Sequence, residues 1–318
     1  VHMRGNLITG SDGSTVIEAP LVSVIIPVYN AEETIERAIE SVFSQSFSAI
    51  EVIVVDDGSV DASASLIANI DRDIVFLSQD NAGAAAARNL GAKNAKGKFL
   101  AFLDADDVWS RFMLEIQVRA LESHSDARFS FTGSILTNEA GLKEVFASNE
   151  SQVSRSCIVR EVGFDEVFVN PCLGTPNVMI ERLLFESLGG FDDSLVTSED
   201  VDLWLRACFS CNVVCVDEQL TYVVDRPDSL TATSGINTFR TQLDVLNKFF
   251  SEHQGYKENN RIVVRKARGL LFEQWGSQEL VFGNHFSAAK LLINALILKP
   301  SLRVVYLLVK ATLLSPLP

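Results

Sequence analysis

Two apolar stretches of the chain each end abruptly in acidic residues. Residues 99–103 are followed by Asp104-Ala105-Asp106-Asp107, and residues 51–55 are followed by Asp56-Asp57-Gly58-Ser59. Carboxylates at the end of a buried strand cost free energy unless a cation neutralises them. Mg²⁺ and Mn²⁺ prefer such oxygen ligands and commonly share them with substrate phosphates. Because open α/β sheets bind ligands at the carboxyl ends of their strands, the two acidic ends predict one ligand site.

The composition is that of a globular protein and argues against a nucleic-acid partner. Of the 318 residues 47% are hydrophobic and 21% are charged, and the formal net charge is −14. A phosphate backbone requires a basic protein face, so we expect no nucleic-acid binding. Five cysteines, an odd number, without a recognisable signal peptide favour a reducing compartment, and we expect a cytoplasmic protein.

Apolar runs alternate with amphipathic segments, which predicts an α/β fold in which helices wrap a parallel sheet. The expected strands are 22–26, 52–55, 74–77, 99–103, 129–135, 177–180, 213–216 and 222–224. The expected helices are 32–46, 61–70, 84–95, 111–123, 182–188 and 201–209. Pro27 is expected to end the first strand, and the polar residues 138–159 are expected to form a loop over the site.

The pattern predicts three regions. Residues 1–20 are rich in Gly and Ser and are expected to be a flexible lead-in, whose Val1-His2-Met3 looks like a tag remnant. Residues 21–233 carry the α/β pattern. Residues 234–318 predict helices only, at 239–250, 263–282 and 288–298, where apolar residues recur with the period of a helix.

The C-terminal region combines positive charge with the most apolar stretch of the chain. Residues 255–318 contain 9 Lys and Arg against 3 Asp and Glu, and residues 291–314 are the most apolar. This combination is typical of a surface that contacts anionic lipid, but also of a packed helical cap with a charged rim. No apolar run reaches the roughly 18 residues of a membrane span, so any membrane contact is expected to be peripheral, on the inner face.

Several short motifs follow one another at characteristic spacing. They are Pro27-Val28-Tyr29-Asn30, Val55-Asp56-Asp57-Gly58-Ser59 with Asp61, Asn81-Ala82-Gly83 with Arg88-Asn89 and Gly91, Leu103-Asp104-Ala105-Asp106-Asp107, Gly189-Gly190-Phe191-Asp192, and Glu199-Asp200 with Asp202. Over residues 22–230 the chain resembles the family 2 glycosyltransferases, which have the GT-A fold, a Rossmann-like and mostly parallel sheet. The resemblance implies transfer of a sugar from a nucleotide-activated donor with inversion at the anomeric carbon, helped by Mn²⁺ or Mg²⁺.

The resemblance also implies how the acidic strand end handles the donor. Asp106 is the expected metal ligand in the Asp-x-Asp (DxD) motif, and Asp104 is expected to reach the ribose, or the metal through water. Asp107 is either a second ligand or the N-cap of the next helix, and we favour the cap. A metal there would neutralise the charge that develops on a diphosphate leaving group.

The nucleotide is expected to lie at the ends of the expected strands 22–26 and 52–55. By resemblance Asp57 accepts the imide N–H of a pyrimidine, so we expect a UDP-sugar, while Asp56 orients the turn. Pro27 and Val28 are expected to line the base pocket, where Tyr29 packs on the base. Arg88 follows on the helix after Gly83, and its guanidinium suits nucleotide oxygens.

An inverting transfer needs a base that deprotonates the acceptor hydroxyl as it attacks. The resemblance gives this role to Asp200, and the alternatives are Glu199 as the base or a helix-capping role. Trp204 either floors the acceptor site or is a buried helix residue.

One position departs from the family pattern. Related sequences often carry a histidine where Arg226 stands, three residues before Ser229. A permanently cationic arginine cannot ligate a metal but can bind the diphosphate directly, which leaves the strength of metal dependence open.

Other functions fit the sequence less well. A phosphatase of the haloacid-dehalogenase type has its Asp-x-Asp on the first strand followed by threonine, where this chain has Val108. A nucleotidyltransferase needs a Gly-rich phosphate loop after its first strand. A non-catalytic nucleotide-sugar or glycan-binding module does not need Asp200. We therefore predict a glycosyltransferase that uses a UDP-sugar to build a surface polysaccharide or similar glycan on a glycan or lipid-linked acceptor; the sequence does not specify the sugar, the linkage or the oligomeric state.

Overall fold

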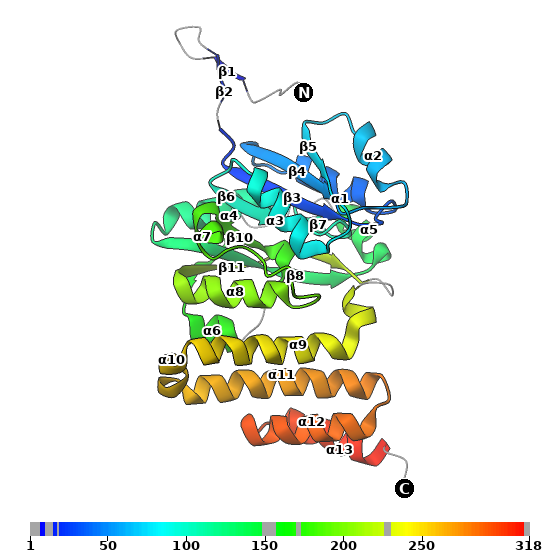
Figure 1. Ribbon diagram of the computed structural model, residues 1–318, viewed down its shortest axis with the longest axis vertical. Coiled ribbons are helices and arrows are strands. Elements are labelled where there is room, and N and C mark those ends of the chain that lie inside the picture. The colour runs from blue at the N-terminus through cyan, green and yellow to red at the C-terminus, as the bar shows by residue number, and fades with distance from the viewer. Residues whose placement is uncertain are drawn as a thin grey trace. The chain divides into compact units, whose positions relative to one another are not determined.

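The computed structural model describes residues 7–9, 15–17, 19–147, 157–169, 173–225 and 230–314 (Figure 1). The chain divides into two compact units. The α/β unit comprises Val1–Gly163 and Cys172–Asp225, and the helical unit comprises Phe164–Pro171 and Arg226–Pro318. The boundary at Arg226 lies close to the one expected from the sequence, but the segment Phe164–Pro171 belongs with the helices at the other end of the chain.

One mixed sheet forms the centre of the α/β unit. Its described strands are β3 (Val22–Val28), β4 (Ile50–Asp56), β5 (Ile74–Ser78), β6 (Phe99–Phe102), β7 (Val108–Trp109), β8 (Ala127–Thr137), β9 (Val159–Val162), β10 (Val178–Glu181) and β11 (Asn212–Val224). They lie in the order β5-β4-β3-β6-β10-β8-β11-β7, with β9 beside β11. Strands β5, β4, β3 and β6 are parallel, whereas β10 is antiparallel to β6 and β8. The predicted parallel core is therefore confirmed, and it is extended by a mixed half.

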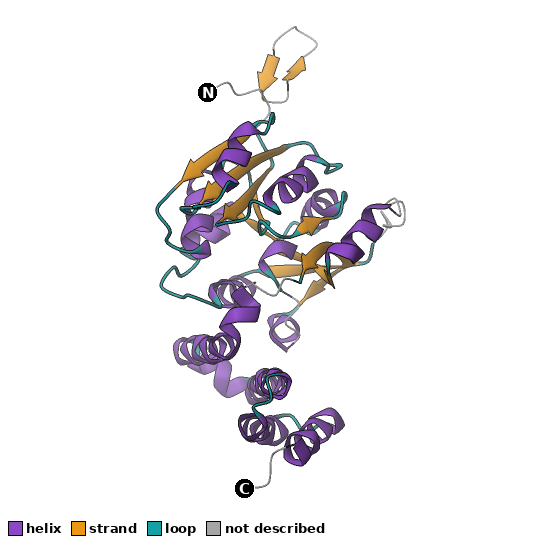
Figure 2. Cartoon of the chain, turned by 90° about the vertical axis from the view of Figure 1, so that its right-hand side faces the viewer, coloured by secondary structure: helices purple, strands orange, loops and turns teal. Residues whose placement is uncertain are grey.

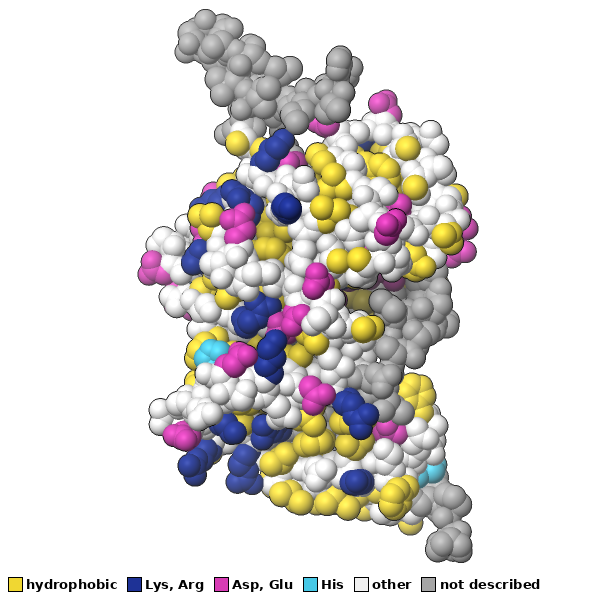
Figure 3. All heavy atoms as spheres, viewed as in Figure 1, with side chains coloured by type: hydrophobic (Ala, Val, Ile, Leu, Met, Phe, Trp, Pro, Cys, Tyr) yellow, Lys and Arg dark blue, Asp and Glu magenta, His cyan; other side chains and the backbone are white. Residues whose placement is uncertain are grey.

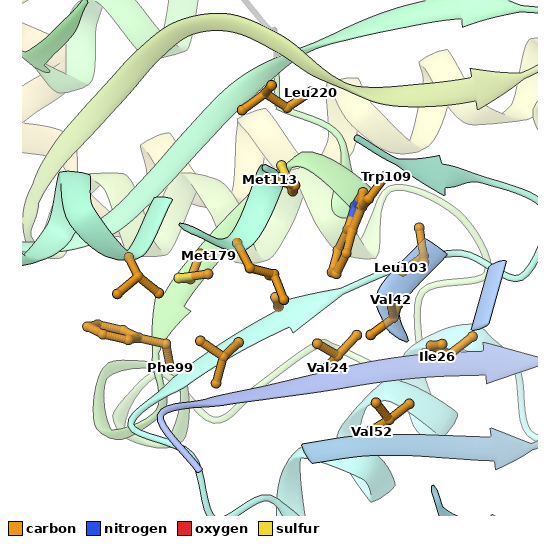
Figure 4. Packing of buried hydrophobic residues seen from close by; sticks show 14 of the residues in the cluster. Val24, Ile26, Val42, Val52, Phe99, Leu103, Trp109, Met113, Met179 and Leu220 are labelled. Atoms are coloured by element: carbon orange, nitrogen blue, oxygen red, sulfur yellow. The ribbon is translucent and has the colours of Figure 1, made fainter. Parts of the chain in front are cut away.

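Helices cover both faces of the sheet (Figure 2). They are α1 (Ile35–Phe43), α2 (Ser63–Asn69), α3 (Ala84–Asn94), α4 (Met113–Ser123), α5 (Glu139–Ala147), α7 (Arg182–Ser187) and α8 (Glu199–Ser210). On one face Val24, Ile26 and Val52 pack with residues of α1 and α4, among them Val42 and Met113 (Figure 4). On the other face α3 lies so close that a Cβ at Gly91 would meet Ile25 Cγ2 at 2.5 Å. Strands buried on both sides explain the unbroken apolar runs in the sequence.

The structure corrects two expectations about strands. Pro27 does not end the first strand but pairs with Val55 inside β3. Proline has no N–H to donate to a neighbouring strand. The pairing between β3 and β6 ends at Ile25, so β6 does not need a hydrogen bond from position 27. The two strands expected at 213–216 and 222–224 form the single strand β11, whose register with β8 shifts on either side of Gln219. A β-bulge accommodates the polar residues that interrupted the apolar pattern.

The structure also corrects the expectations that residues 138–159 form a loop and that residues 1–20 lack secondary structure. Part of the loop expected at 138–159 is helix α5. The side chain of Asn138 precedes this helix and accepts a hydrogen bond from Gly141 N at 3.0 Å. Leu142 of α5 is buried and packs on Tyr222 and Val224. One apolar contact of this kind was too weak a pattern to predict the helix from the sequence. Residues 148–156 lie outside the described residues. The lead-in contains a short antiparallel hairpin, β1 (Leu7–Thr9) with β2 (Thr15–Ile17).

The described part of the helical unit is built from α6 (Phe164–Val169), α9 (Leu230–Glu252), α10 (Gln254–Asn259), α11 (Arg261–Val281), α12 (His285–Leu298) and α13 (Leu302–Leu314). Phe164 of α6 stacks on Phe249 of α9, which explains why α6 belongs to this unit. Close packing of α11 and α12 depends on Gly276, where a Cβ would meet Leu292 Cγ at 2.7 Å. Among the described helices, none combines the length and the apolar character needed to cross a bilayer.

A cluster of aromatic rings joins the end of β6 to α8. Phe102 is fully buried and its ring lies 5.3 Å from that of Phe191 and 6.3 Å from that of Trp204. Trp204 is itself buried, so it is a core residue rather than the floor of an acceptor site. Because Phe102 precedes the acidic strand end and Trp204 follows Asp200 on the helix, this cluster fixes two segments of the predicted site.

We expect Phe102→Ala to lower the free energy of unfolding by about 3–5 kcal/mol, because the change leaves a cavity among the rings of Phe185, Phe191 and Trp204. Phe76→Ala, at a residue that is 40% exposed, should lower it by at most about 1 kcal/mol. Chemical denaturation followed by circular dichroism measures both. Equal losses for the two variants would contradict a central role for the aromatic cluster.

Candidate active site

The carboxyl ends of β3, β4 and β6 meet at one edge of the sheet. Val28 of β3 lies opposite Asp56 of β4, and Leu103 N donates a hydrogen bond to Ile25 O at 3.0 Å. The sheet therefore brings together the three segments that the sequence predicted to share a ligand, at the edge where such sheets bind ligands.

The turns after β3 and β4 are tied together by hydrogen bonds. Asn30 N donates to Ser59 Oγ at 3.0 Å, and Val60 N donates back to Asn30 Oδ1 at 2.9 Å. Asn30 has a φ of 49°, a left-handed conformation that asparagine tolerates better than most residues. This turn leaves Tyr29 half exposed, whereas Val28 is buried at the strand end. The predicted contacts of Pro27, Val28 and Tyr29 with a nucleobase stay predictions.

Asp57 anchors the start of α3. Its Oδ1 accepts hydrogen bonds from Gln79 Nε2 at 2.7 Å and Ala82 N at 2.8 Å, and its Oδ2 accepts one from Gly83 N at 2.8 Å. A carboxylate offers about four lone-pair positions, so these three bonds leave room for one more donor. The predicted contact with a pyrimidine imide is compatible with this geometry, provided that it is made alongside the anchoring bonds.

The turn after β4 brings Gly58 against the segment before α3. Gly58 has a φ of +74°, and a Cβ there would meet Asn81 N at 2.8 Å. Only glycine satisfies both conditions without strain. Asp56 Oδ1 accepts a hydrogen bond from Ser59 N at 3.2 Å, which agrees with the turn-orienting role expected for this residue.

Arg88 joins the acidic strand end to the helix of the predicted base. Its Nη2 donates to Asp104 Oδ1 at 2.6 Å, and its Nη1 donates to Glu199 Oε1 at 2.9 Å. The arginine is buried, which by itself would lower its pKa, but the charges of Asp104 and Glu199 hold that pKa above its usual value. Its buried Nε has no acceptor among the described residues. The predicted contact of Arg88 with nucleotide oxygens stays a prediction.

The three aspartates of the strand end have different surroundings. The side chain of Asp104 is 30% exposed and pairs with Arg88. Asp107 is buried, and its Oδ1 accepts a hydrogen bond from Val224 N at 3.1 Å, so it fastens β11 rather than capping α4, which begins only at Met113. Burial, then the negative charges of Asp104 and Asp106, raise the pKa of Asp107 to about 8.

Arg37 supports the turn that carries Asp106, a contact that the sequence did not reveal. Its Nη2 donates to Asp106 O at 3.2 Å, and its Nη1 pairs with Glu139 of α5 at 2.7 Å. Arg37 lies on α1 and Glu139 lies 102 residues later, in a segment predicted to be a loop. The spacing offered no signal for this pair.

The donor set of the strand end fits a metal that arrives with a substrate. The described residues contain no group of three or more His, Cys, Asp or Glu that would hold a metal ion by themselves. Mg²⁺ and its analogues are commonly bound by one or two carboxylates together with substrate phosphates, so a three-residue protein cage is not required. Asp106 and Asp104 together would make a set of this size, and their binding of a metal stays a prediction.

Asp200 lies in the first turn of α8, in surroundings that raise its pKa. Burial, then the charge of Glu199, raise this pKa to about 6, while a hydrogen bond from Val201 N at 2.7 Å opposes the shift. Ser198 before them adopts a left-handed φ of 68°, an uncommon conformation that is often found at functional sites. A carboxylate with a pKa near 6 is ionised at neutral pH and more basic than an ordinary aspartate.

The Gly189-Gly190 turn is fixed by residues of α3 and α8. Asn89 donates to Phe191 O at 2.9 Å and accepts from Phe191 N at 3.0 Å. Arg206 donates to Gly190 O at 2.9 Å and pairs with Asp202 at 2.6 Å. Asp202 therefore supports the helix through Arg206. Arg226 lies outside the described residues, and its predicted contact with a diphosphate stays a prediction.

Comparisons with known proteins agree with this fold. The model of the family described as Glycosyl transferase family 2 matches residues 23–137. The putative teichuronic acid biosynthesis glycosyltransferase TuaG of Bacillus subtilis is 36% identical over 194 residues, which cover 58% of this chain and 71% of TuaG. The protein named UDP-Glc:alpha-D-GlcNAc-diphosphoundecaprenol beta-1,3-glucosyltransferase WfgD, from Escherichia coli, is 30% identical over 72% of this chain and 86% of WfgD. An uncharacterized glycosyltransferase of Rickettsia felis is 34% identical, and this chain covers about a third of its length, 34%.

Solved structures show the same fold at low identity. Residues 1–349 of S. aureus TarS in complex with UDP-GlcNAc have a TM-score of 0.57 and 19% identity, covering 89% of this chain and 91% of that one. The mannosyltransferase PcManGT of Pyrobaculum calidifontis, in complex with GDP-Man and Mn²⁺, has a TM-score of 0.61 and 18% identity, covering 93% and 81%. The fold is that of the GT-A glycosyltransferases. The chain belongs to glycosyl transferase family 2, as the motifs predicted.

We expect Arg88→Met to lower the free energy of unfolding by about 2–3 kcal/mol, because it leaves two carboxylates close together without their cation. Adding Glu199→Gln should recover part of the loss, since it removes one of the two charges. Arg72→Met removes a pair with Glu40 in which both side chains are at least half exposed, and should cost less than about 1 kcal/mol. Urea denaturation of the wild type, these variants and the single variant Glu199→Gln measures the differences, and strict additivity of Arg88→Met and Glu199→Gln in the double variant would contradict the bridge.

Proposed function

We propose that this chain is an inverting glycosyltransferase that moves a sugar from a UDP-sugar to a hydroxyl of a glycan or lipid-linked acceptor. The observation that carries the proposal is the Arg88 bridge between Asp104 and Glu199. It holds the acidic strand end, suited to a diphosphate, next to Asp200, a carboxylate of raised pKa suited to act as a base. The residues proposed to hold the leaving group and the residue proposed to activate the nucleophile thus lie at the same edge of the sheet.

The donor base would be read at the ends of β3 and β4. Asp57 would accept the imide N–H of uracil on its remaining lone pair, and Tyr29, half exposed beside it, would pack on the ring. The TarS complex with UDP-GlcNAc and the name of WfgD support a uridine donor. PcManGT was solved with GDP-Man, so the fold alone does not specify the base, and the assignment depends on Asp57.

The leaving group would be held by the acidic strand end. Asp106, with Asp104 beside it, would bind Mn²⁺ or Mg²⁺ together with the diphosphate; when bound, that metal neutralises the charge that grows on the leaving oxygens. The Mn²⁺ in the PcManGT complex supports this assignment. Arg37 would hold the turn of Asp106 in place, and Arg88 would hold Asp104 at the strand end. Arg226 would add a permanent positive charge for the diphosphate.

The acceptor would be activated by Asp200. As the acceptor oxygen attacks the anomeric carbon, Asp200 takes its proton, and the bond from that carbon to the diphosphate breaks with its electron pair leaving on UDP. Glu199 is the weaker candidate, because its Oε1 already accepts a charged hydrogen bond from Arg88. Asp200 remains the better base because its pKa is raised to about 6.

The acceptor and the place of action are proposed from one relative and from the C-terminal region. The name of WfgD specifies an acceptor linked to diphosphoundecaprenol. We extend this to a lipid-linked acceptor class here, which places the enzyme in the cytoplasm at the inner face of a membrane, in contact with it through the C-terminal helices.

Calorimetric titration with UDP, GDP and TDP, each with and without Mn²⁺, tests the donor site. We expect UDP to bind most tightly and Mn²⁺ to strengthen its binding in the wild type but not in Asp106→Ala. UDP binding that Mn²⁺ leaves unchanged would contradict the metal role of Asp106. Failure of all three nucleotides to bind would contradict the proposed donor site.

Asp200→Asn should lower the single-turnover rate of sugar transfer by about 10²–10⁴-fold, because it removes the base. The wild-type rate should also fall about tenfold per pH unit below about pH 6, since protonated Asp200 cannot accept a proton. Radiolabelled UDP-sugar at saturating Mn²⁺ gives both rates.

Asp193→Asn, at an exposed position seven residues before Asp200, is the matched control and should keep the wild-type rate and pH profile. A near-normal rate in Asp200→Asn would assign the base elsewhere. Normal UDP binding without transfer by the wild type to any acceptor would favour a binding module instead.

A further inference from the structure

The helices α12 and α13 carry apolar side chains on their exposed sides as well as on their packed sides. Ala288, Leu292, Ala295, Val304 and Ala311 are buried between them and their neighbours. The opposite sides expose Phe286, Ile293, Ile297, Leu302, Val305, Tyr306, Val309 and Leu313, each of which is 42% to 90% exposed. These eight residues are called the outer face. Packing within the described part of the unit therefore leaves a set of large apolar side chains on these helices exposed.

The outer face follows the period of an α-helix. In α12 the exposed positions 286, 290, 293 and 297 recur at steps of four, three and four residues. In α13 the positions 302, 306, 309 and 313 recur at the same steps. Each set forms one stripe along its helix. Figure 3 shows hydrophobic side chains gathered along the edge that α12 and α13 form. Single exposed apolar residues are ordinary, but two consecutive helices with such stripes form a surface suited to binding.

The charge of the segment indicates what the outer face meets. Residues 280–318 contain Lys290, Lys299, Arg303 and Lys310 but no Asp or Glu, in a chain whose net charge is −14. Lys290 lies within the stripe of α12, and Lys310 lies beside the stripe of α13; both are exposed. Apolar stripes with lysine at their borders are typical of helices that lie in a membrane interface, where lysine stems reach the anionic headgroups.

A second copy of the chain fits the outer face less well. In a two-fold dimer the same surface meets itself, so the exposed lysines of one copy would face those of the other. Like charges across an interface oppose association. A lipid surface with anionic headgroups instead complements both the apolar stripes and the lysines.

We propose that the outer face of α12 and α13 binds an anionic lipid surface, with its apolar side chains among the headgroups and Lys290 and Lys310 paired with lipid phosphates. The inference deepens the membrane location in the proposed function by naming the binding face and the lipid class. The structural observations behind it do not depend on sugar transfer.

Flotation of the full chain with phosphatidylcholine vesicles, with or without phosphatidylglycerol, tests the proposal. The wild type should bind the phosphatidylglycerol vesicles, and added salt should weaken binding. Tyr306→Ser/Val309→Ser/Leu313→Ser should lower the partition coefficient at least about tenfold, because less apolar area leaves water. Lys290→Gln/Lys310→Gln should lower it by up to about 30-fold on anionic vesicles.

The matched control is Ile262→Ser/Leu183→Ser, which changes two apolar residues that are exposed elsewhere. This control should bind vesicles like the wild type. Absence of wild-type binding, or equal binding by the control and the serine triple variant, would overturn the proposal. So would light scattering that shows a wild-type dimer, a monomeric triple variant and no vesicle binding, because the outer face would then bind a second copy.

Titration of the same proteins with UDP distinguishes a failure of the proposed transferase function from a failure of the proposed lipid binding. The serine triple variant should bind UDP like the wild type, which also shows that its α/β unit is folded. Failure of the wild type to bind UDP would contradict the proposed function and leave a positive vesicle result standing.

Discussion

The arrangement of the site depends on one buried guanidinium shared by two carboxylates. Arg88 bonds Asp104 at 2.6 Å and Glu199 at 2.9 Å with different nitrogens, which a lysine ammonium on a flexible stem would not do in the same fixed geometry. Removal of a charge from water is costly, and the two carboxylates offset that cost only while all three groups keep their places. The bridge therefore fixes the acidic strand end and the first turn of α8, where Asp200 lies.

The rest of the α/β unit places Arg88 where it can make this bridge. Asp57 holds the start of α3 through the N–H groups of Ala82 and Gly83, and Gly91 lets the same helix lie directly on the sheet. The aromatic cluster around Phe102 and Trp204 joins β6 to α8. Three different kinds of interaction, namely hydrogen bonds to a helix start, close backbone packing and ring contacts, thus converge on one edge of the sheet.

Much of this was predictable from sequence because the signals were local. The apolar runs ending in Asp56 and Asp104 specified buried parallel strands, and parallel strands bring their carboxyl ends to one edge. The partner of Arg88 on α8 was not predictable, because Glu199 is 111 residues away and nothing in the spacing marks the pair. The same holds for Arg37 with Glu139, for the bulged strand β11, and for α6, which packs with helices that follow it by many residues. Contacts of this kind are decided by the three-dimensional packing of segments whose local patterns are weak.

A crystal structure of the chain with Mn²⁺ and a non-transferable UDP-sugar tests the proposed site most directly. We expect uracil at Asp57, Mn²⁺ at Asp106, Arg88 still bonded to Asp104 and Glu199, and the Asp200 carboxylate on the side of the anomeric carbon opposite the diphosphate. A donor bound away from this edge, or an Arg88 that has left both carboxylates, would contradict it.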